Sequence, residues 1–274
     1  MKLSLWLDGK IVPASKALIS ASDPAVQSGQ GLFEVIRGYY GVPFLLDRHI
    51  DRMRKSARHF GFKMRWSDAA IDKGVRELLR VNRIADAYIR IVLTAGGSLM
   101  ILTKKRTPLP AAWYKNGAAV RFAPFRRDPA GPLFGHKTLN YLENILTHEA
   151  ARKAGYADAL IRAIDGRVLE GCVTNVFLVK DGVLRTPALK GVLPGVTRQV
   201  VMELAKRQGI KVVEGFVTPR DLERVEEVFL TNALFEILPV TQIETHRIAS
   251  RRPGPRTHRL LVAYAQRIAD AVED

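Results

Sequence analysis

The chain has 274 residues, 47% of them hydrophobic, which is enough to bury a core and excludes a disordered protein. No run approaches eighteen apolar residues and the N-terminal segment breaks at Asp8-Gly9, so we expect a cytoplasmic protein without membrane span or signal peptide. Because Cys172 is the single cysteine and the six histidines are scattered, an intrachain disulfide and a zinc site of regular spacing are both excluded.

The charge balance is strongly basic: 43 Lys and Arg against 27 Asp and Glu give a formal net charge of +16. The basic residues gather in four separate stretches, at residues 52–58, 104–106, 126–127 and 247–259. No nucleic-acid recognition motif accompanies them, and aromatic residues make up only 8% of the chain. We therefore expect the charge to attract an anionic substrate or cofactor, or to form a solvated face, rather than to bind nucleic acid as the main role.

The first part of the chain reads as hairpins with two helices. Residues 3–12 predict a hairpin around the Asp8-Gly9 turn. Asp47 is expected to cap a helix that Gly61 ends, and Ser67 to open a second helix. Further strands are predicted at residues 31–37, 43–45, 88–93 and 99–102. Short helices beside a hairpin-rich sheet indicate an α+β fold.

The best candidate for a domain boundary is the segment that starts with Thr107-Pro108-Leu109-Pro110, because its two prolines continue neither a helix nor a strand. We place one domain at residues 1–106, a linker at residues 107–116 and a second domain at residues 117–274.

Beyond the linker, a strand at residues 118–125 precedes a helix that begins near Lys137 and points Leu142, Leu146 and Ala150 inward. The remaining predicted elements are strands at 159–164, 168–179 and 183–186, a helix at 197–208, a strand, a short helix from Thr218, a strand at 227–231 and a C-terminal helix.

Lys137 stands at the start of its predicted helix. The positive end of a helix dipole disfavours an ammonium group, and a neutral amine is what imine formation requires. Lys137 is therefore a candidate nucleophile, and the alternative is a solvated surface lysine.

Glu170 is the one carboxylate in the apolar strand segment Val168-Leu169-Glu170-Gly171-Cys172-Val173. Strand alternation allows it to face solvent. The alternative is a functional carboxylate that holds a pyridine nitrogen protonated, so that the ring can act as an electron sink.

A possible phosphate-binding site follows in Leu193-Pro194-Gly195-Val196-Thr197-Arg198, where a glycine turn precedes the start of a helix. Thr197 is either an ordinary N-cap or a phosphate ligand, and Thr231-Asn232-Ala233 is either a strand-end turn or a second contact to the same anion. Arg52 is either a solvated arginine or the guanidinium that a buried phosphate needs. An amine, a carboxylate and a phosphate seat are the protein groups that pyridoxal phosphate requires.

Together these motifs resemble the class IV aminotransferases, the fold type IV pyridoxal-phosphate enzymes that include branched-chain aminotransferases, D-amino-acid aminotransferases and aminodeoxychorismate lyases. The resemblance extends from Trp6 to about Ile243. Its most specific segments are GQGLFEVIRGYYG (29–41), PFLLDRHIDRMRKSA (43–57), KTLNYLEN (137–144), LEGCVTNVF (169–177), LPGVTR (193–198) and LTNALFEILPV (230–240).

The resemblance implies a small N-terminal α/β domain, a larger C-terminal pseudobarrel domain and a homodimer. It implies that Lys137 forms the internal aldimine with pyridoxal 5'-phosphate and shuttles the α-proton, and that Glu170 binds the pyridine nitrogen. The other cofactor ligands that it implies are Arg52, Leu193, Val196, Thr197, Asn232 and Ala233. Phe33 and Arg90 are candidate substrate contacts, although Arg90 can equally be a plain strand arginine.

No subgroup pattern is complete. Thr231-Asn232-Ala233-Leu234 resembles the lyases, but Val35 stands where many lyases carry a threonine. Phe33-Glu34-Val35 resembles the D-amino-acid aminotransferases, whereas Thr94-Ala95-Gly96 lacks their arginine. Ala87-Tyr88-Ile89-Arg90 resembles the branched-chain enzymes.

We predict an enzyme that moves an amino group between an amino acid and a 2-oxo acid. The alternative is an aminodeoxychorismate lyase that forms 4-aminobenzoate and pyruvate. A third hypothesis is a noncatalytic basic protein that binds nucleic acid.

Overall fold

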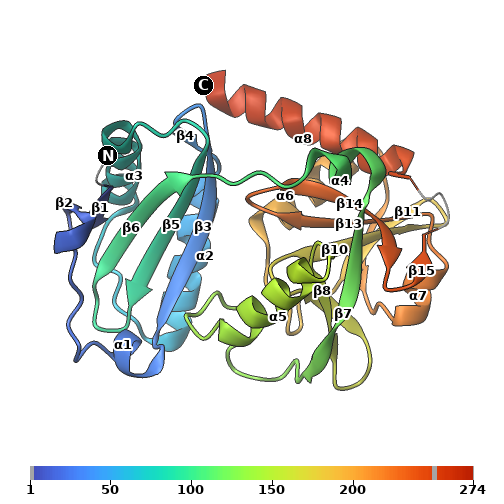
Figure 1. The fold of residues 1–274 in the computed structure, drawn as a ribbon, viewed down its shortest axis with the longest axis horizontal. Helices are drawn as coiled ribbons and strands as arrows, with labels where there is room; N and C mark the ends of the chain where they lie inside the picture. Colours follow the sequence, from blue (N-terminus) through green and yellow to red (C-terminus); the bar gives the residue numbers. More distant parts are fainter. Residues whose placement is uncertain (1–2, 249–251, 274) are drawn as a thin grey trace. The chain divides into compact units, whose positions relative to one another are not determined.

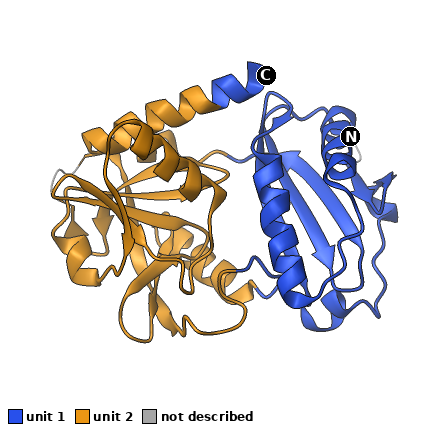
Figure 2. Cartoon of the chain, turned by 180° about the vertical axis from the view of Figure 1, so that it is seen from behind, with its two compact units in different colours: residues 1–107, 136–140, 268–274 blue, residues 108–135, 141–267 orange. Residues whose placement is uncertain are grey.

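The computed structural model describes residues 3–248 and 252–273. The chain divides into two compact units (Figure 2). Unit 1 comprises Met1–Thr107, His136–Asn140 and Ile268–Asp274, and unit 2 comprises Pro108–Gly135 and Tyr141–Arg267. The division between the units thus falls at Thr107/Pro108, and two later segments of the chain also belong to unit 1.

Unit 1 is built on a six-stranded antiparallel sheet with the strand order β2-β1-β6-β5-β3-β4 among the described residues. Its strands are β1 (Ser4–Leu7), β2 (Lys10–Pro13), β3 (Gly31–Tyr39), β4 (Val42–Pro43), β5 (Ala87–Thr94) and β6 (Leu99–Lys105). Its helices are the 3-10 helix η1 (Ala14–Lys16), α1 (Pro24–Ser28), α2 (Leu46–Phe60) and α3 (Asp68–Asn82). Helix α2 packs on β3, and α3 packs on β1 and β6 (Figure 1).

Local sequence sets the ends of these helices. The Ser67 side chain accepts a hydrogen bond from the Ala70 amide and caps α3, as predicted. Gly61 ends α2 in the left-handed conformation (φ 72°), which glycine adopts without strain. Asp47 is not the cap of α2, because Leu45 takes that position and Asp47 lies in the first helical turn, where its charge favours the helix dipole.

Leu78 lies in the core of unit 1, and we expect its truncation to destabilise the protein strongly. This side chain is fully buried beside Ile71, Val75 and Ile101. We expect Leu78→Ala to lower the free energy of unfolding by about 2–5 kcal/mol, through lost burial and the cavity left behind. Urea denaturation followed by tryptophan fluorescence measures the change. Leu18→Ala is the matched control, because Leu18 is 79% exposed; equal midpoints for the two variants would contradict the prediction.

Unit 2 carries a mixed sheet whose path runs β12-β11-β10-β13-β14-β7-β8-β9, with β15 paired to β14, in the described part of the chain. Its strands are β7 (Ala118–Arg127), β8 (Ala159–Ala163), β9 (Val168–Gly171), β10 (Asn175–Lys180), β11 (Val183–Pro187), β12 (Val212–Gly215), β13 (Glu227–Asn232), β14 (Glu236–Ile243) and β15 (His246–Arg247). Strand β9, the last on the path, also contacts β10 and β11, so the sheet curls back on itself. This curled sheet confirms the predicted α+β fold.

Five helices accompany this sheet in the described residues: α4 (Ala111–Asn116), α5 (Leu142–Lys153), α6 (Val196–Arg207), α7 (Pro219–Glu223) and α8 (Pro255–Glu273), the last of which continues into the segment assigned to unit 1. The predicted inward face of α5 is wrong, because Leu142 and Leu146 are 68% and 56% exposed and Ala150 is exposed as well. Asn144 and Ala151 are buried instead. The hydrogen bonds of Asn144, together with Ala151 in an apolar cluster, fix which face of α5 turns inward.

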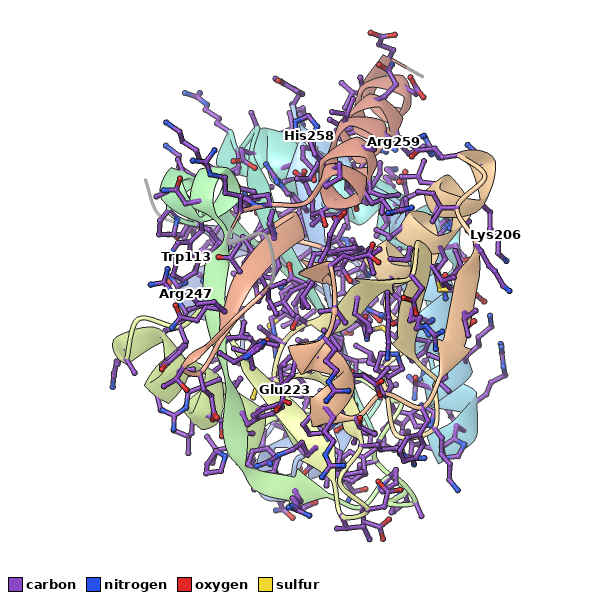
Figure 3. All side chains as sticks on the ribbon, turned by 90° about the vertical axis from the view of Figure 1, so that its right-hand side faces the viewer. Trp113, Lys206, Glu223, Arg247, His258 and Arg259 are labelled. Carbon is purple, nitrogen blue, oxygen red and sulfur yellow. The ribbon has the colours of Figure 1, made fainter. Side chains whose placement is uncertain are left out.

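The excess positive charge lies on the surface of the protein. Lys206, Arg247 and Arg259 of unit 2, for example, are exposed and come from separate elements (Figure 3). None of the helices in residues 3–248 and 252–273 is long and apolar enough to cross a membrane.

Candidate active site

Lys137 lies in an extended segment rather than at a helix start, so that prediction is wrong. Helix α5 begins only at Leu142, without a side-chain cap. The segment instead pairs with the start of β3: the Phe33 amide donates to the Lys137 carbonyl (2.8 Å), and Thr138 forms a bridge with Leu32. Backbone hydrogen bonds to a strand have replaced the first turn of the expected helix. The helix dipole therefore does not act on Lys137.

His136 attaches this segment to α2. Its Nδ1 lies 3.0 Å from the Ser56 hydroxyl, and its ring stacks on that of His59 with centroids 4.3 Å apart. Burial, and secondarily His59, lower the pKa of His136, so the ring is neutral at pH 7. These contacts and the β3 pairing fix the backbone on both sides of the lysine.

The lysine cluster, defined as Phe33, Arg90 and Lys137, joins three of the predicted residues on unit 1. The Lys137 Nζ lies 4.4 Å from the centroid of the Phe33 ring, and the Arg90 Cζ lies 4.0 Å from the same centroid. Phe33 is buried in β3, whereas Arg90 in β5 and Lys137 are half-buried. One aromatic ring therefore holds an amine and a guanidinium, which are the groups that can attack a carbonyl and bind a carboxylate.

Arg52 is held by a buried carboxylate that the sequence reasoning missed. Its Nε donates to Glu34 Oε1 (2.8 Å) and its Nη2 to Glu34 Oε2 (2.5 Å), while His49 Nδ1 lies 2.8 Å from Oε2. Burial alone would raise the pKa of Glu34, but Arg52 and His49 hold it at about 2. Burial lowers the pKa of His49, and the positive charges of Arg52 and Lys137 act in the same direction.

The pairing of Glu34 makes the stability of unit 1 depend on pH. Since its folded pKa lies below the value of 4.5 for an unperturbed glutamate, the stabilisation is fully present above pH 4.5 and is lost as the pH falls toward 2. The role of Arg52 as a phosphate ligand stays a prediction.

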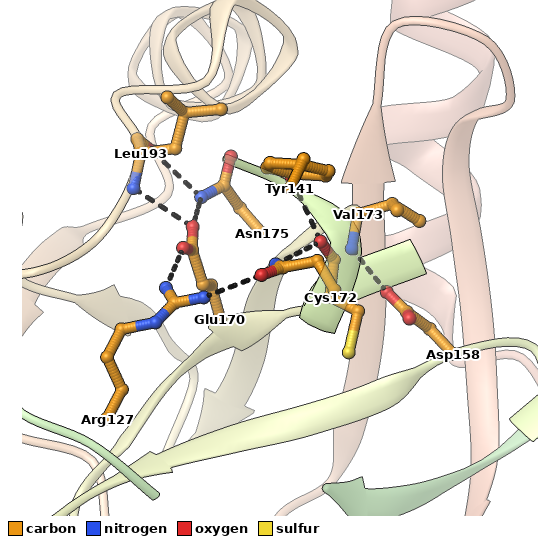
Figure 4. A network of polar contacts seen from close by, with 9 residues as sticks. Arg127, Tyr141, Asp158, Glu170, Cys172, Val173, Asn175 and Leu193 are labelled. Atoms are coloured by element: carbon orange, nitrogen blue, oxygen red, sulfur yellow. Dashed lines mark hydrogen bonds and ion pairs between the residues drawn. The ribbon is translucent and has the colours of Figure 1, made fainter. Parts of the chain in front are cut away.

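The carboxylate cluster, defined as Arg127, Glu170, Asn175 and Leu193, lies on unit 2 (Figure 4). Glu170 is only 8% exposed, so it does not face solvent as strand alternation allowed. Its Oε1 accepts a hydrogen bond from Arg127 Nη1 (2.7 Å), and its Oε2 accepts from the Leu193 amide (2.9 Å) and from Asn175 Nδ2 (3.5 Å). A buried, paired carboxylate of this kind can bind a protonated ring nitrogen.

A turn at Cys172, Val173 and Thr174 breaks the single strand that was predicted over residues 168–179. The Gly171 amide donates to the Thr174 carbonyl (2.8 Å) and closes the turn. The buried Asp158 accepts from the Val173 amide (3.2 Å) and the Thr174 hydroxyl (2.8 Å). This turn sets where β9 ends and β10 begins, and thereby places Glu170 and Asn175.

Two side chains from residues 141–144 bind the same turn. Tyr141 donates its hydroxyl to the Cys172 carbonyl (2.9 Å), and Asn144 Nδ2 donates to the same oxygen (2.7 Å) (Figure 4). Burial raises the pKa of the Tyr141 hydroxyl and of the Cys172 thiol, so both are protonated at pH 7. The side chains around Glu170 are therefore rigidly held and shielded from solvent.

The start of α6 offers uncapped backbone amides. Gly195 is the N-cap and provides no side-chain hydrogen bond, while Val196 and Thr197 are buried. A Cβ on Gly195 would lie 2.0 Å from Asn175 Oδ1, so any larger residue here would have to displace the Asn175 side chain. Asn175 also donates to the Leu193 carbonyl (3.0 Å). The turn before α6 is thus joined to the carboxylate cluster.

The strand end at Thr231 lies beside this turn, because Thr231 pairs with Asn175 across β13 and β10. The Thr231 hydroxyl is buried and has no hydrogen-bond partner among the described residues. The Asn232 side chain caps the following turn through the Leu234 amide (2.9 Å) and the Phe235 amide (3.0 Å). The cofactor roles of Asn232 and Ala233 stay predictions.

No group of three or more His, Cys, Asp or Glu in the described parts of the chain could hold a metal ion. The lysine cluster and the carboxylate cluster contribute an amine, two guanidinium groups and one carboxylate.

Comparison with known proteins identifies the family. The sequence model of amino-transferase class IV matches residues 31–243. A Methanocaldococcus jannaschii protein, provisionally named a branched-chain-amino-acid aminotransferase, is 37% identical over 270 residues, which cover 94% of each chain. A D-alanine aminotransferase from Bacillus licheniformis is 31% identical over 274 residues, which cover 95% of each chain.

Solved structures agree. The branched-chain amino acid aminotransferase of Escherichia coli superposes with a TM-score of 0.90 at 28% identity, over 97% of this chain and 94% of that one. A Legionella pneumophila protein provisionally named 4-amino-4-deoxychorismate lyase has a TM-score of 0.84 at 25% identity, over 92% and 96% of the two chains. The chain therefore belongs to the class IV aminotransferases and is a transaminase of fold type IV that uses pyridoxal phosphate.

Proposed function

We propose that this enzyme transfers the amino group of a branched-chain amino acid to a 2-oxo acid. The observation that carries the proposal is the lysine cluster, in which Phe33 holds the amine of Lys137 and the guanidinium of Arg90 on one ring. The Methanocaldococcus relative and the Escherichia coli structure, both named for branched-chain amino acids, support this substrate class.

Each residue of the lysine cluster has a part in this proposal. Arg90 binds the α-carboxylate of the substrate through a charge-assisted hydrogen bond. Lys137 Nζ, as a neutral amine, removes the proton from the substrate α-carbon. The Phe33 ring, which both groups contact, holds them in place. When bound, pyridoxal phosphate supplies the electron sink for the electron pair left at the α-carbon.

The residues of unit 2 fit the cofactor. Glu170 is a buried carboxylate with its orientation fixed by Arg127 and the Leu193 amide. The uncapped amides at the start of α6 and the unpartnered Thr231 hydroxyl suit an anion such as the phosphate group. We propose that Glu170 binds the ring nitrogen, that Leu193 packs on the ring, and that Val196 and Thr197 bind the phosphate.

The first experiment is an absorption titration of the holoenzyme with L- and D-amino acids, each added without an acceptor. The proposal expects conversion of the cofactor to its amino form by leucine, isoleucine and valine, and recovery on addition of a branched-chain 2-oxo acid. Conversion by D-alanine alone would contradict the branched-chain assignment and point to the activity named for the Bacillus relative.

Aminodeoxychorismate lyase is the second candidate, and the Legionella structure favours it. A lyase needs no 2-oxo acid acceptor, so release of 4-aminobenzoate and pyruvate from aminodeoxychorismate separates the two activities. Val35, which cannot relay a proton, supports the transaminase.

We further infer that the enzyme acts as a homodimer, as the resemblance to its family implies. The exposed Leu142, Ile145 and Leu146 of α5 are apolar side chains of the kind that subunit interfaces bury. Light scattering of the purified holoenzyme is expected to give twice the chain mass of 30.5 kDa. A single-chain mass across the working concentration range would contradict this inference.

A further inference from the structure

Arg127 is a buried arginine whose guanidinium has one charged partner in the described residues. It is the last residue of β7 and is 5% exposed. Its Nη1 donates to Glu170 Oε1 (2.7 Å) and its Nη2 to Asn144 Oδ1 (3.4 Å), while its Cζ lies 4.4 Å from the centroid of the Phe134 ring. The ion pair with Glu170 (Figure 4), a neutral hydrogen bond and the Phe134 ring thus orient Arg127.

The backbone of Arg127 is fixed as well. It pairs with Ala163 in the parallel ladder between β7 and β8, and its carbonyl accepts a hydrogen bond from the Ile164 amide (3.0 Å). Asn144, which receives the Arg127 hydrogen bond, donates its own amide to the Cys172 carbonyl (2.7 Å). Arg127 therefore connects Glu170 to the turn that ends β9 through a single intermediate side chain.

We propose that Arg127 is a positioning residue that keeps Glu170 ionised and fixed in orientation, so that the cofactor ring nitrogen faces a full negative charge. This inference rests on the proposed role of Glu170. Arg127 acts through Glu170 and needs no contact with the cofactor.

The physical reason is the cost of a buried charge. A carboxylate removed from water takes up a proton unless a cation or several hydrogen bonds stabilise its charge. The Leu193 amide and Asn175 are neutral donors, and the 3.5 Å contact to Asn175 is long. The nearby Tyr141, Cys172 and Asp158 supply no positive charge, because the first two are protonated and Asp158 is acidic. Arg127, whose Nη1 lies 2.7 Å from Glu170 Oε1, supplies a positive charge that compensates Glu170.

The protonation state of Glu170 determines the protonation state of the cofactor ring nitrogen that it contacts. An ionised Glu170 accepts a hydrogen bond and favours a protonated ring nitrogen. A protonated Glu170 has lost the negative charge that favours the pyridinium and can donate its O–H to an unprotonated ring nitrogen. The protonation state of that nitrogen therefore reports on Arg127 without any measurement of activity.

The test compares variants that separate charge from hydrogen bonding. Arg127→Gln keeps a donor of similar reach without the charge, and Arg127→Lys keeps the charge without the planar fork. Arg126→Gln is the matched control, because Arg126 is the exposed neighbour on the same strand. Each apoprotein is reconstituted with pyridoxal phosphate carrying ¹⁵N in the ring, and the ¹⁵N resonance is recorded beside pyridine and pyridinium standards.

We expect the wild type, Arg126→Gln and Arg127→Lys to show the protonated resonance, and Arg127→Gln to move to the unprotonated one. Equal resonances for Arg127→Gln and Arg127→Lys would overturn the inference. If Arg127→Gln does not fold, the double variant Arg127→Gln/Glu170→Gln shows whether the unpaired charge of Glu170 is the cause, because it removes that charge. The inference is then tested by Arg127→Lys alone, and an unprotonated resonance in this variant overturns it.

Glu170→Gln separates this inference from the proposed function. If it moves the resonance while Arg127→Gln does not, Glu170 keeps its role and the role of Arg127 is wrong. If Glu170→Gln leaves the resonance unchanged, the proposed contact between Glu170 and the ring nitrogen is itself wrong.

Discussion

Replacement of Lys137 by alanine is expected to lower the turnover of transamination by at least about 10³-fold, because the variant lacks both the nucleophilic amine and the base for the α-proton. The fold is expected to persist. The hydrogen bonds that hold this segment come from its backbone and from His136, and Lys137→Ala removes neither. Steady-state rates with leucine and a 2-oxo acid measure the loss.

Lys105→Ala is the matched control, since Lys105 is an exposed lysine on β6 of the same unit. A second readout is independent of turnover: after borohydride reduction of the holoenzyme, mass spectrometry should find the cofactor mass on the peptide that contains Lys137. Rates within tenfold of the wild type, or a label on another lysine, would show that Lys137 is not the reactive amine.

Glu170→Gln is expected to leave the cofactor bound but to slow removal of the α-proton by about 10²–10³-fold, the usual effect of losing one preorganised electrostatic contact. It is also expected to lower the stability of unit 2, because Arg127 then remains buried without its counter-charge. Stopped-flow absorbance after mixing with leucine gives the rate, and thermal denaturation gives the stability.

Glu223→Gln is the control for this second variant, because Glu223 is an exposed glutamate of unit 2 (Figure 3). If Glu170→Gln reacted as fast as the wild type, the carboxylate would have no part in stabilising charge on the ring. If the melting temperature also stayed unchanged, the ion pair with Arg127 would be no more important than a surface contact.

Most elements could be predicted because their ends have local signals. The Asp8-Gly9 and Asp181-Gly182 turns both connect hairpins, and both aspartates adopt positive φ. Ser67 marks the start of α3 through its side-chain cap, and Gly61 marks the end of α2 through its left-handed conformation. Strand β14 was missed because Pro239 lies in its middle, a position that proline rarely takes in a central strand.

The helix expected at Lys137 failed for a nonlocal reason. Residues 137–139 look compatible with the helix that follows them, but their backbone groups bond to β3, far away in the sequence. The break between β9 and β10 has a similar cause, because Asp158, Tyr141 and Asn144 hold the turn from outside it. In both cases the partners lie elsewhere in the chain, so the sequence of the segment itself does not indicate that they bind it.

The candidate site, too, could be predicted only in part, because contacts between distant segments leave no local signal. Lys137, Phe33 and Arg90 were named from the sequence, and the structure brings these three together. Glu34, His49 and Arg127 were not named as site residues, although His49 pairs with the buried Glu34 and Arg127 with the buried Glu170. Each pair joins residues on different elements, and the basic composition of the chain hides Arg127 among many similar residues.

The pairing of residues 137–139 with β3 has a consequence for biosynthesis. Unit 1 cannot be completed when its own strands leave the ribosome, because a later segment must return to Leu32 and Phe33. A fragment cut at Thr107 would contain the aromatic ring without the amine, and the complementary fragment would contain the amine without the ring. Lys137 can therefore reach its place beside Phe33 only after the first part of unit 2 has been translated.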